Sequence, residues 1–176
     1  IMLSKLDEST ILVIDDSKAN LKVIESAIKS NTNYNVILSD SGKRVIESLD
    51  NYHCDLILLD VIMPDINGYD VAKVIKQHHM FNNVPILFLT SLTDSDEITN
   101  GFLAGGVDYI LKPFIEEELF ARMKTHLELK IIRDGLENRG NILEDIVEEK
   151  SKQIQEMTIS LVVALENANL YNDEDT

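Results

Sequence analysis

The segment Asp55-Leu-Ile-Leu-Leu-Asp-Val-Ile-Met-Pro-Asp65 joins an uninterrupted apolar run to a group of turn residues. Four apolar residues precede Asp60, and a strand that is apolar at every position is typical of a parallel sheet covered by helices on both faces. Comparable runs occur elsewhere in the chain, so the sequence predicts five strands at residues 10–16, 34–39, 55–60, 84–90 and 107–111.

Segments in which apolar residues recur at helical spacing separate these runs. They cover residues 18–29, 42–49, 69–75 and 97–104. Strand and helix therefore alternate along the chain, which indicates an α/β fold. We expect a doubly wound, five-stranded parallel sheet over about residues 8–125.

The composition limits the kinds of partner. The chain has 31 acidic and 16 basic residues, which gives a formal charge of -15. This charge repels nucleic-acid phosphates and anionic lipid surfaces, so we expect neither as a direct partner. The apolar runs are too short to cross a membrane. No secretion signal is visible and Cys54 is the only cysteine, so we expect a cytoplasmic protein.

In sheets of this kind, function gathers outside the carboxyl ends of the strands. The predicted strands end on, or are followed directly by, polar side chains: Asp15, Asp16, Asp60, Thr90 and Lys112. Clustered carboxylates repel one another and favour a divalent cation, and an all-oxygen ligand set favours Mg²⁺ or Mn²⁺ over zinc. A carboxylate beside such a metal can attack a phosphoryl donor, while a hydroxyl and an ammonium hold the phosphoryl oxygens. The pattern predicts phosphoryl transfer to an aspartate.

Four segments in order resemble the receiver domain of two-component response regulators. They are Ile14-Asp15-Asp16, Leu59-Asp60-Val61-Ile62-Met63-Pro64-Asp65 with Gly68, Leu89-Thr90-Ser91, and Asp108-Tyr109-Ile110-Leu111-Lys112-Pro113-Phe114. The resemblance covers about two thirds of the chain and implies a flavodoxin-like receiver at residues 10–126, after a lead-in at residues 1–9. It also implies that Asp60 accepts phosphate from a sensor histidine kinase or a phosphotransfer protein.

The resemblance assigns further roles. Asp16 and Asp60 would bind Mg²⁺ (or Mn²⁺) directly, Asp15 would assist through water, and the Ile62 carbonyl would be a backbone ligand. Lys112 would contact the phosphoryl group, and the Lys112-Pro113 bond is expected to be cis. Thr90 and Tyr109 would form the switch pair, in which the hydroxyl moves toward the phosphate and the ring follows into the vacated space.

The sequence after Phe114 stays helical and carries a coiled-coil seam over an expected linker at residues 127–170. The seam residues are Leu129, Ile132, Leu136, Leu143, Ile146, Ile154, Met157 and Leu161. The step from Leu143 to Ile154 is one heptad plus four residues, which is a stutter. We expect a parallel homodimer, and the alternative is a helix that folds back on its own receiver. Gly135 and Gly140 favour a kink or break.

The last residues, 160–176, resemble the entry into an HD-GYP phosphodiesterase domain. This implies that residues 171–176 begin an output domain and that the parent protein hydrolyses cyclic di-GMP. A diguanylate cyclase, or another output that follows a coiled coil, is the alternative.

Two other classes of function remain to be weighed against a receiver. A phosphorylation-independent protein-interaction module would stay fully active after Asp60→Ala. An aspartate-based phosphohydrolase would turn over phosphomonoesters, but it needs a second aspartate two residues after the nucleophile, where Ile62 stands. We therefore expect no enzyme activity beyond self-phosphorylation of the receiver.

Overall fold

The computed structural model describes residues 6–91 and 95–173. Its elements are β1 (Thr10–Ile14), α2 (Lys18–Asn31), β2 (Asn35–Ser39), α3 (Gly42–Glu47), the short 3₁₀ helix η1 (Leu49–Asn51), β3 (Leu56–Asp60), α4 (Gly68–Gln77), β4 (Ile86–Thr90), α5 (Ser95–Leu103), β5 (Asp108–Leu111) and α6 (Glu116–Asp173). The alternation of strand and helix that the sequence predicts is therefore confirmed.

The five strands form one parallel sheet in the order β2-β1-β3-β4-β5. In the register, Leu58 of β3 lies opposite Val13 of β1 and Leu87 of β4. The chain reverses its direction of progress across the sheet between β1 and β3. Such a reversal opens a crevice at the carboxyl ends of the two strands.

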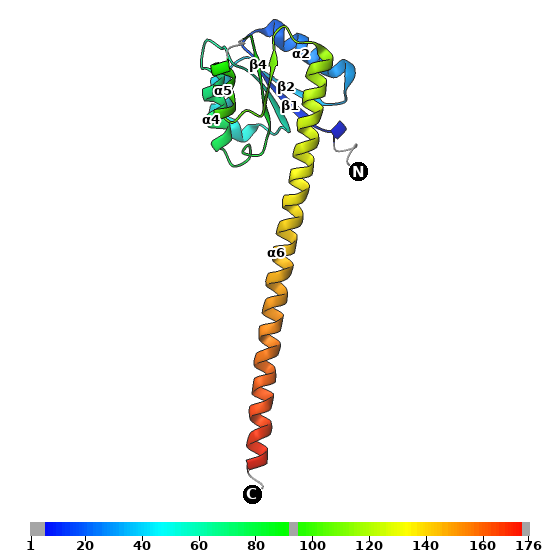
Figure 1. The fold of residues 1–176 in the computed structure, drawn as a ribbon, viewed down its shortest axis with the longest axis vertical. Helices are drawn as coiled ribbons and strands as arrows, with labels where there is room; N and C mark the ends of the chain where they lie inside the picture. The colour runs from blue at the N-terminus through cyan, green and yellow to red at the C-terminus, as the bar shows by residue number, and fades with distance from the viewer. Residues whose placement is uncertain (1–5, 92–94, 174–176) are drawn as a thin grey trace. The chain divides into compact units, whose positions relative to one another are not determined.

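Helices cover both faces of the sheet (Figure 1), and a hydrophobic core lies on each face. On β3, Ile57 and Leu59 pack with residues of α3 and α4, whereas Leu56 and Leu58 pack with residues of α2 and the first turns of α6. All five residues of β3 are buried. This two-sided burial is the physical reason why the strand is apolar throughout and does not alternate with polar residues.

The first strand is shorter than the predicted residues 10–16. It ends at Ile14 because the carboxylate of Asp15 accepts a hydrogen bond from the backbone N–H of Ser17 at 2.9 Å, which turns the chain toward α2. Ser17 then caps α2 by accepting a hydrogen bond from the backbone N–H of Asn20. The other four strands begin one or two residues later than predicted.

The last helix, α6, runs without interruption from Glu116 to Asp173. The predicted break at Gly135 and Gly140 is therefore wrong. A glycine keeps its backbone hydrogen bonds in a helix, and its cost of about 1 kcal/mol is small beside the flanking helix-forming residues. The chain divides into two compact units between Ile132 and Arg133, a boundary that lies within this helix.

The predicted seam residues whose side chains are described are between 48% and 72% exposed. They are Leu129, Ile132, Leu136, Leu143, Ile146, Ile154 and Met157. The side chain of Leu161 lies outside the described part of the chain, as do residues 1–5 of the lead-in and residues 174–176 of the expected output-domain start. None of the helices that the structure describes has a stretch apolar and long enough for a membrane span.

Candidate functional site

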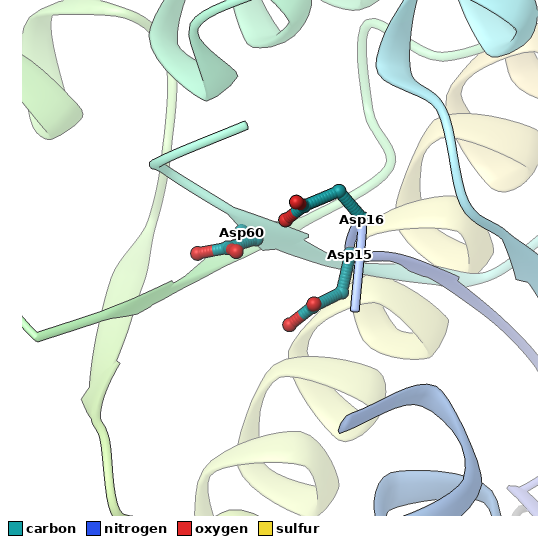
Figure 2. A group of neighbouring side chains, drawn as sticks. All are labelled: Asp15, Asp16 and Asp60. Atoms are coloured by element: carbon teal, nitrogen blue, oxygen red, sulfur yellow. The ribbon is translucent and has the colours of Figure 1, made fainter. Parts of the chain in front are cut away.

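Three carboxylates meet at the carboxyl ends of β1 and β3. One oxygen from each of Asp15, Asp16 and Asp60 lies within 4.8 Å of the others. The two strands are neighbours, with Ile14 opposite Leu59, so the residues that follow them emerge at the same edge. The three side chains point to the same side of this edge (Figure 2). Asp15 and Asp60 are buried and Asp16 is exposed.

Several donors hold the fully buried carboxylate of Asp15 in place. The side-chain amide of Asn20 donates to both of its oxygens at 3.1 Å, and Ser17 donates its backbone N–H at 2.9 Å. Sequence reasoning missed Asn20. The available signal was a polar residue in the first turn of the helix that follows the acidic pair, a position that faces back over the end of β1.

The ammonium of Lys112 bridges two of the acids. Its Nζ lies 2.7 Å from Oδ2 of Asp15 and 3.1 Å from Oδ1 of Asp60. Lys112 follows β5 directly and donates its backbone N–H to the carbonyl of Thr90 at 2.7 Å. The Lys112-Pro113 peptide bond is cis, the isomer that the family resemblance implies. Two strands, β3 and β4, separate β5 from β1 in the sheet, and the fold thus brings one cation from β5 to the acidic cluster.

The charges around Asp60 do not balance. Burial is the largest effect on the pKa of this carboxyl and raises it, and the charge of Asp15 raises it further. Lys112 lowers the pKa, as does the backbone N–H of Ile62, which donates to Oδ1 at 3.4 Å, but the net shift is upward. The one ammonium contacts two of the three carboxylates, so the cluster keeps an excess of negative charge. Hard oxygen ligands with excess negative charge suit a hard divalent cation, so these residues fit Mg²⁺.

Thr90 and Tyr109, the predicted switch pair, lie on neighbouring strands. Thr90 is buried at the end of β4, and Tyr109 is half-buried on β5, opposite Phe88. Both line a cavity of about 10 Å³, together with Tyr69, Phe88, Ile98, Gly101, Phe102 and Asp108. This volume suffices for about one water molecule. A phenol ring therefore enters the space beside Thr90 only if other atoms move out.

Comparisons with known proteins show the family to which the chain is similar. The family model described as the response regulator receiver domain matches residues 11–124. The chain is 34% identical over 171 residues to a Vibrio cholerae serotype O1 protein named probable cyclic di-GMP phosphodiesterase, a match that covers 97% of this chain. It is 40% identical over 117 residues, 66% of its length, to the uncharacterized transcriptional regulatory protein YrkP of Bacillus subtilis.

A solved receiver structure has a similar fold. The receiver domain of the sensor histidine kinase PA1611 from Pseudomonas aeruginosa, whose structure has a magnesium ion coordinated in the active site cleft, superposes with a TM-score of 0.63 at 30% identity. The match covers 68% of this chain and 98% of that one. The chain spans 38% of the Vibrio cholerae relative and 48% of YrkP. From the matched residues and the shared fold, the chain belongs to the response regulator receiver family and contains the receiver domain of a two-component response regulator.

Proposed function

We propose that the receiver accepts a phosphoryl group on Asp60 and that this reaction is its signalling input. The observation that carries the proposal is the convergence at Asp60: two further carboxylates have oxygens within 4.8 Å, and the Lys112 ammonium lies 3.1 Å from Oδ1. Phosphoryl transfer depends mostly on positioning and on neutralisation of charge. The carboxylate of Asp60, which lies between two other acids and an ammonium, has both the position and the neighbouring positive charge.

In the proposed reaction, a carboxylate oxygen of Asp60 forms a bond to phosphorus as the bond from phosphorus to the leaving group breaks. The leaving group keeps the electron pair of that bond. Lys112 stabilises negative charge on the phosphoryl oxygens, because its ammonium already lies beside Asp60. Asn20 and Ser17 keep the Asp15 carboxylate in its position during the transfer.

The proposed metal ligands are Asp16 and Asp60, with Asp15 acting through water and the backbone carbonyl of Ile62 completing the protein ligands. Mg²⁺ (or Mn²⁺) bound there supplies neutralisation of the charge on the transferring group. Support comes from the unbalanced charge of the acidic cluster and from the magnesium ion in the related PA1611 receiver domain.

The proposed partners follow from the family and from α6. Receiver domains take phosphate from histidine kinases or phosphotransfer proteins, and we propose the same donor here. A proposed parallel homodimer would cover the apolar side chains that α6 exposes, such as Leu136, Leu143 and Ile154. In this proposal the receiver occupies residues 10–126 and the coiled-coil linker residues 127–170. We also propose action in the cytoplasm, where a single unpaired cysteine remains reduced.

The proposed output is a cyclic di-GMP phosphodiesterase that lies outside this chain. The Vibrio cholerae relative with that name matches this chain over 97% of its length, so its similarity extends beyond the receiver into α6. YrkP covers a smaller share of the chain, 66%. The similarity of the linker therefore favours the phosphodiesterase over a transcriptional output.

Intact-mass analysis after incubation with Mg²⁺ and acetyl phosphate tests the proposed input. The wild-type chain should gain one phosphoryl group, and Asp60→Asn should gain none. Asp65→Asn is the matched control: this nearby acid instead accepts hydrogen bonds from Ser41 and from the backbone of Lys43, at the start of α3, so its loss should leave phosphorylation intact. Equal labelling of wild type and Asp60→Asn would refute the proposal and favour the phosphorylation-independent interaction module.

A further inference from the structure

A second polar cluster lies outside the acidic site, where the first turns of α6 pack against β5. The carboxylate of Asp108, the first residue of β5, is its centre. Nη1 of Arg122 lies 2.8 and 2.9 Å from the two oxygens, and Nε2 of His126 lies 3.1 Å from Oδ2. The backbone N–H of Tyr109 donates to Oδ1 at 2.9 Å. The cluster therefore contacts the residue of the switch pair that lies on β5.

The guanidinium of Arg122 is held on several sides. Nε donates to Glu118 at 2.9 Å, and Glu118, Arg122 and His126 are spaced four residues apart, so they share one face of α6. The side chain of Arg122 is 35% exposed, whereas those of Asp108 and His126 are 19% and 15% exposed. Partial burial strengthens charge-assisted hydrogen bonds relative to fully exposed ones, so this cluster differs from an ordinary surface ion pair.

The same guanidinium lies over the ring of Tyr109. Cζ of Arg122 is 6.0 Å from the ring centroid, the limit of a favourable cation-π contact. Phe102 of α5 packs against the ring edge-on, with centroids 6.3 Å apart. Tyr109 also lines the small cavity beside Thr90. Tyr109 thus contacts a cation of α6 and shares the lining of one small cavity with Thr90.

We propose that Arg122 is a positioning residue for the switch: it holds the ring of Tyr109 away from Thr90 and ties the ring to α6 through Asp108. The inference rests on the proposed function and goes beyond it by naming the residue that connects the switch to the helix. When the ring moves into the space near Thr90, it loses its contact with the guanidinium of Arg122. Arg122 therefore disfavours the phosphorylated state, and the loss of its contact with the ring transmits the formation of that state to α6.

Linkage between the two positions makes the proposal measurable. If Arg122 stabilises the outward ring, then its removal favours any ligand that stabilises the inward ring. Beryllofluoride with Mg²⁺ is the probe, because it mimics a phosphoryl group on a carboxylate without being consumed. A contact of the cation-π kind corresponds to a change of roughly two- to fivefold in affinity.

Calorimetric titration of beryllofluoride, at fixed Mg²⁺, should give two- to fivefold tighter binding for Arg122→Gln than for wild type. Arg122→Lys keeps a cation beside Asp108, and hence the fold, and it should shift the affinity in the same direction by a smaller factor. The matched control is Lys73→Gln, which breaks the exposed pair between Lys73 and Asp70 on α4 and should leave the affinity unchanged.

A double-mutant cycle separates positioning from a general structural role. In a Tyr109→Ala background, the effect of Arg122→Gln on beryllofluoride affinity should disappear, because no ring remains to be held. An unchanged or weaker affinity in Arg122→Gln, or the same change with and without Tyr109, would overturn the inference while the proposed function stands. Absence of binding to the wild-type chain would overturn both.

Discussion

The carboxyl edge of the sheet and the helix from Arg133 onward form in different ways. At the edge, Lys112 and Asp15 are 97 residues apart in the chain, and the sheet brings their charged atoms to 2.7 Å. Along the helix, each hydrogen bond joins residues one turn apart, and side chains such as Leu136 and Leu143 are 62% exposed. The edge is thus built by contacts within one chain, whereas the apolar side chains that the structure describes on the helix stay largely exposed.

This difference has an energetic meaning. The half-buried ammonium of Lys112 is held by charge and by a packed fold, so its loss leaves the buried carboxylates of Asp15 and Asp60 without their cation. An exposed leucine on a helix contributes stabilisation only when a second surface covers it. The site region should therefore respond to single substitutions within one chain, and the helix should respond through association.

The largest effect should come from Lys112→Met. Removal of the ammonium beside Asp60 should slow phosphorylation by acetyl phosphate by a factor between about a hundred and a thousand, because charge on the phosphoryl oxygens loses its fixed partner. The rate is followed by intact mass. Lys18→Met, at an 81% exposed side chain that lies 3.9 Å from Asp40, is the control and should react at the wild-type rate. A Lys112→Met rate within threefold of wild type would show that the edge does not depend on this contact.

A helix substitution should act on association. Leu143→Asp places a charge in the predicted seam and should weaken the dimer about a hundredfold, since two chains each lose a buried apolar side chain. Sedimentation equilibrium over a range of concentrations measures the dissociation constant. Asn141→Asp adds the same charge two residues earlier, off the seam, and should change little. A wild-type chain that remains monomeric at high concentration would contradict the predicted dimer.

The junction between β5 and α6 belongs to the packed region, and its stability should depend on pH. Burial works to raise the pKa of Asp108, but hydrogen bonds from Arg122, His126 and the Tyr109 backbone outweigh it and hold the pKa below its ordinary value. Asp108→Asn should therefore cost roughly 1 to 2 kcal/mol of unfolding free energy at pH 7.

The sign of this dependence follows from the lowered pKa. A carboxyl group whose pKa is lower in the folded state stabilises the fold above its unfolded pKa, near pH 4, and the stabilisation is lost as the pH falls through the folded value. Urea unfolding of wild type and Asp108→Asn should thus give a difference that is full at pH 7 and shrinks below about pH 4. A difference that stays constant over this range would contradict the charged role of Asp108.

The smallest effect should come from Gly140→Ala. A Cβ at this position meets no atom within 4 Å, so the substitution should only remove the backbone entropy cost of glycine and stabilise α6 by up to about 1 kcal/mol. Thermal unfolding followed by circular dichroism at 222 nm measures the change. A loss of helix stability would mean that a neighbour, such as a second copy, packs closely against Gly140.

The sequence was a reliable guide wherever structure depends on local pattern. Continuous apolar runs predicted five strands, and helical spacing predicted the helices between them, with ends displaced by about two residues. The polar residues at the strand ends predicted the acidic cluster, because parallel strands all present their carboxyl ends at one edge. The predicted break in α6 was wrong, because the two glycines were weighed without the helix-forming residues around them.

The sequence by itself determined the type and order of the elements and the residues offered at the edge of the sheet, since backbone periodicity and strand ends are local properties. Tertiary structure alone decided which donors reach which acceptors. The contacts of Lys112 with Asp15 and Asp60 join strands that are distant in the chain. Those of Asn20 with Asp15, and of Arg122 and His126 with Asp108, depend on how a helix packs against the strand that precedes it. No spacing along the sequence reports such distances, because they are set by the packing of the whole core.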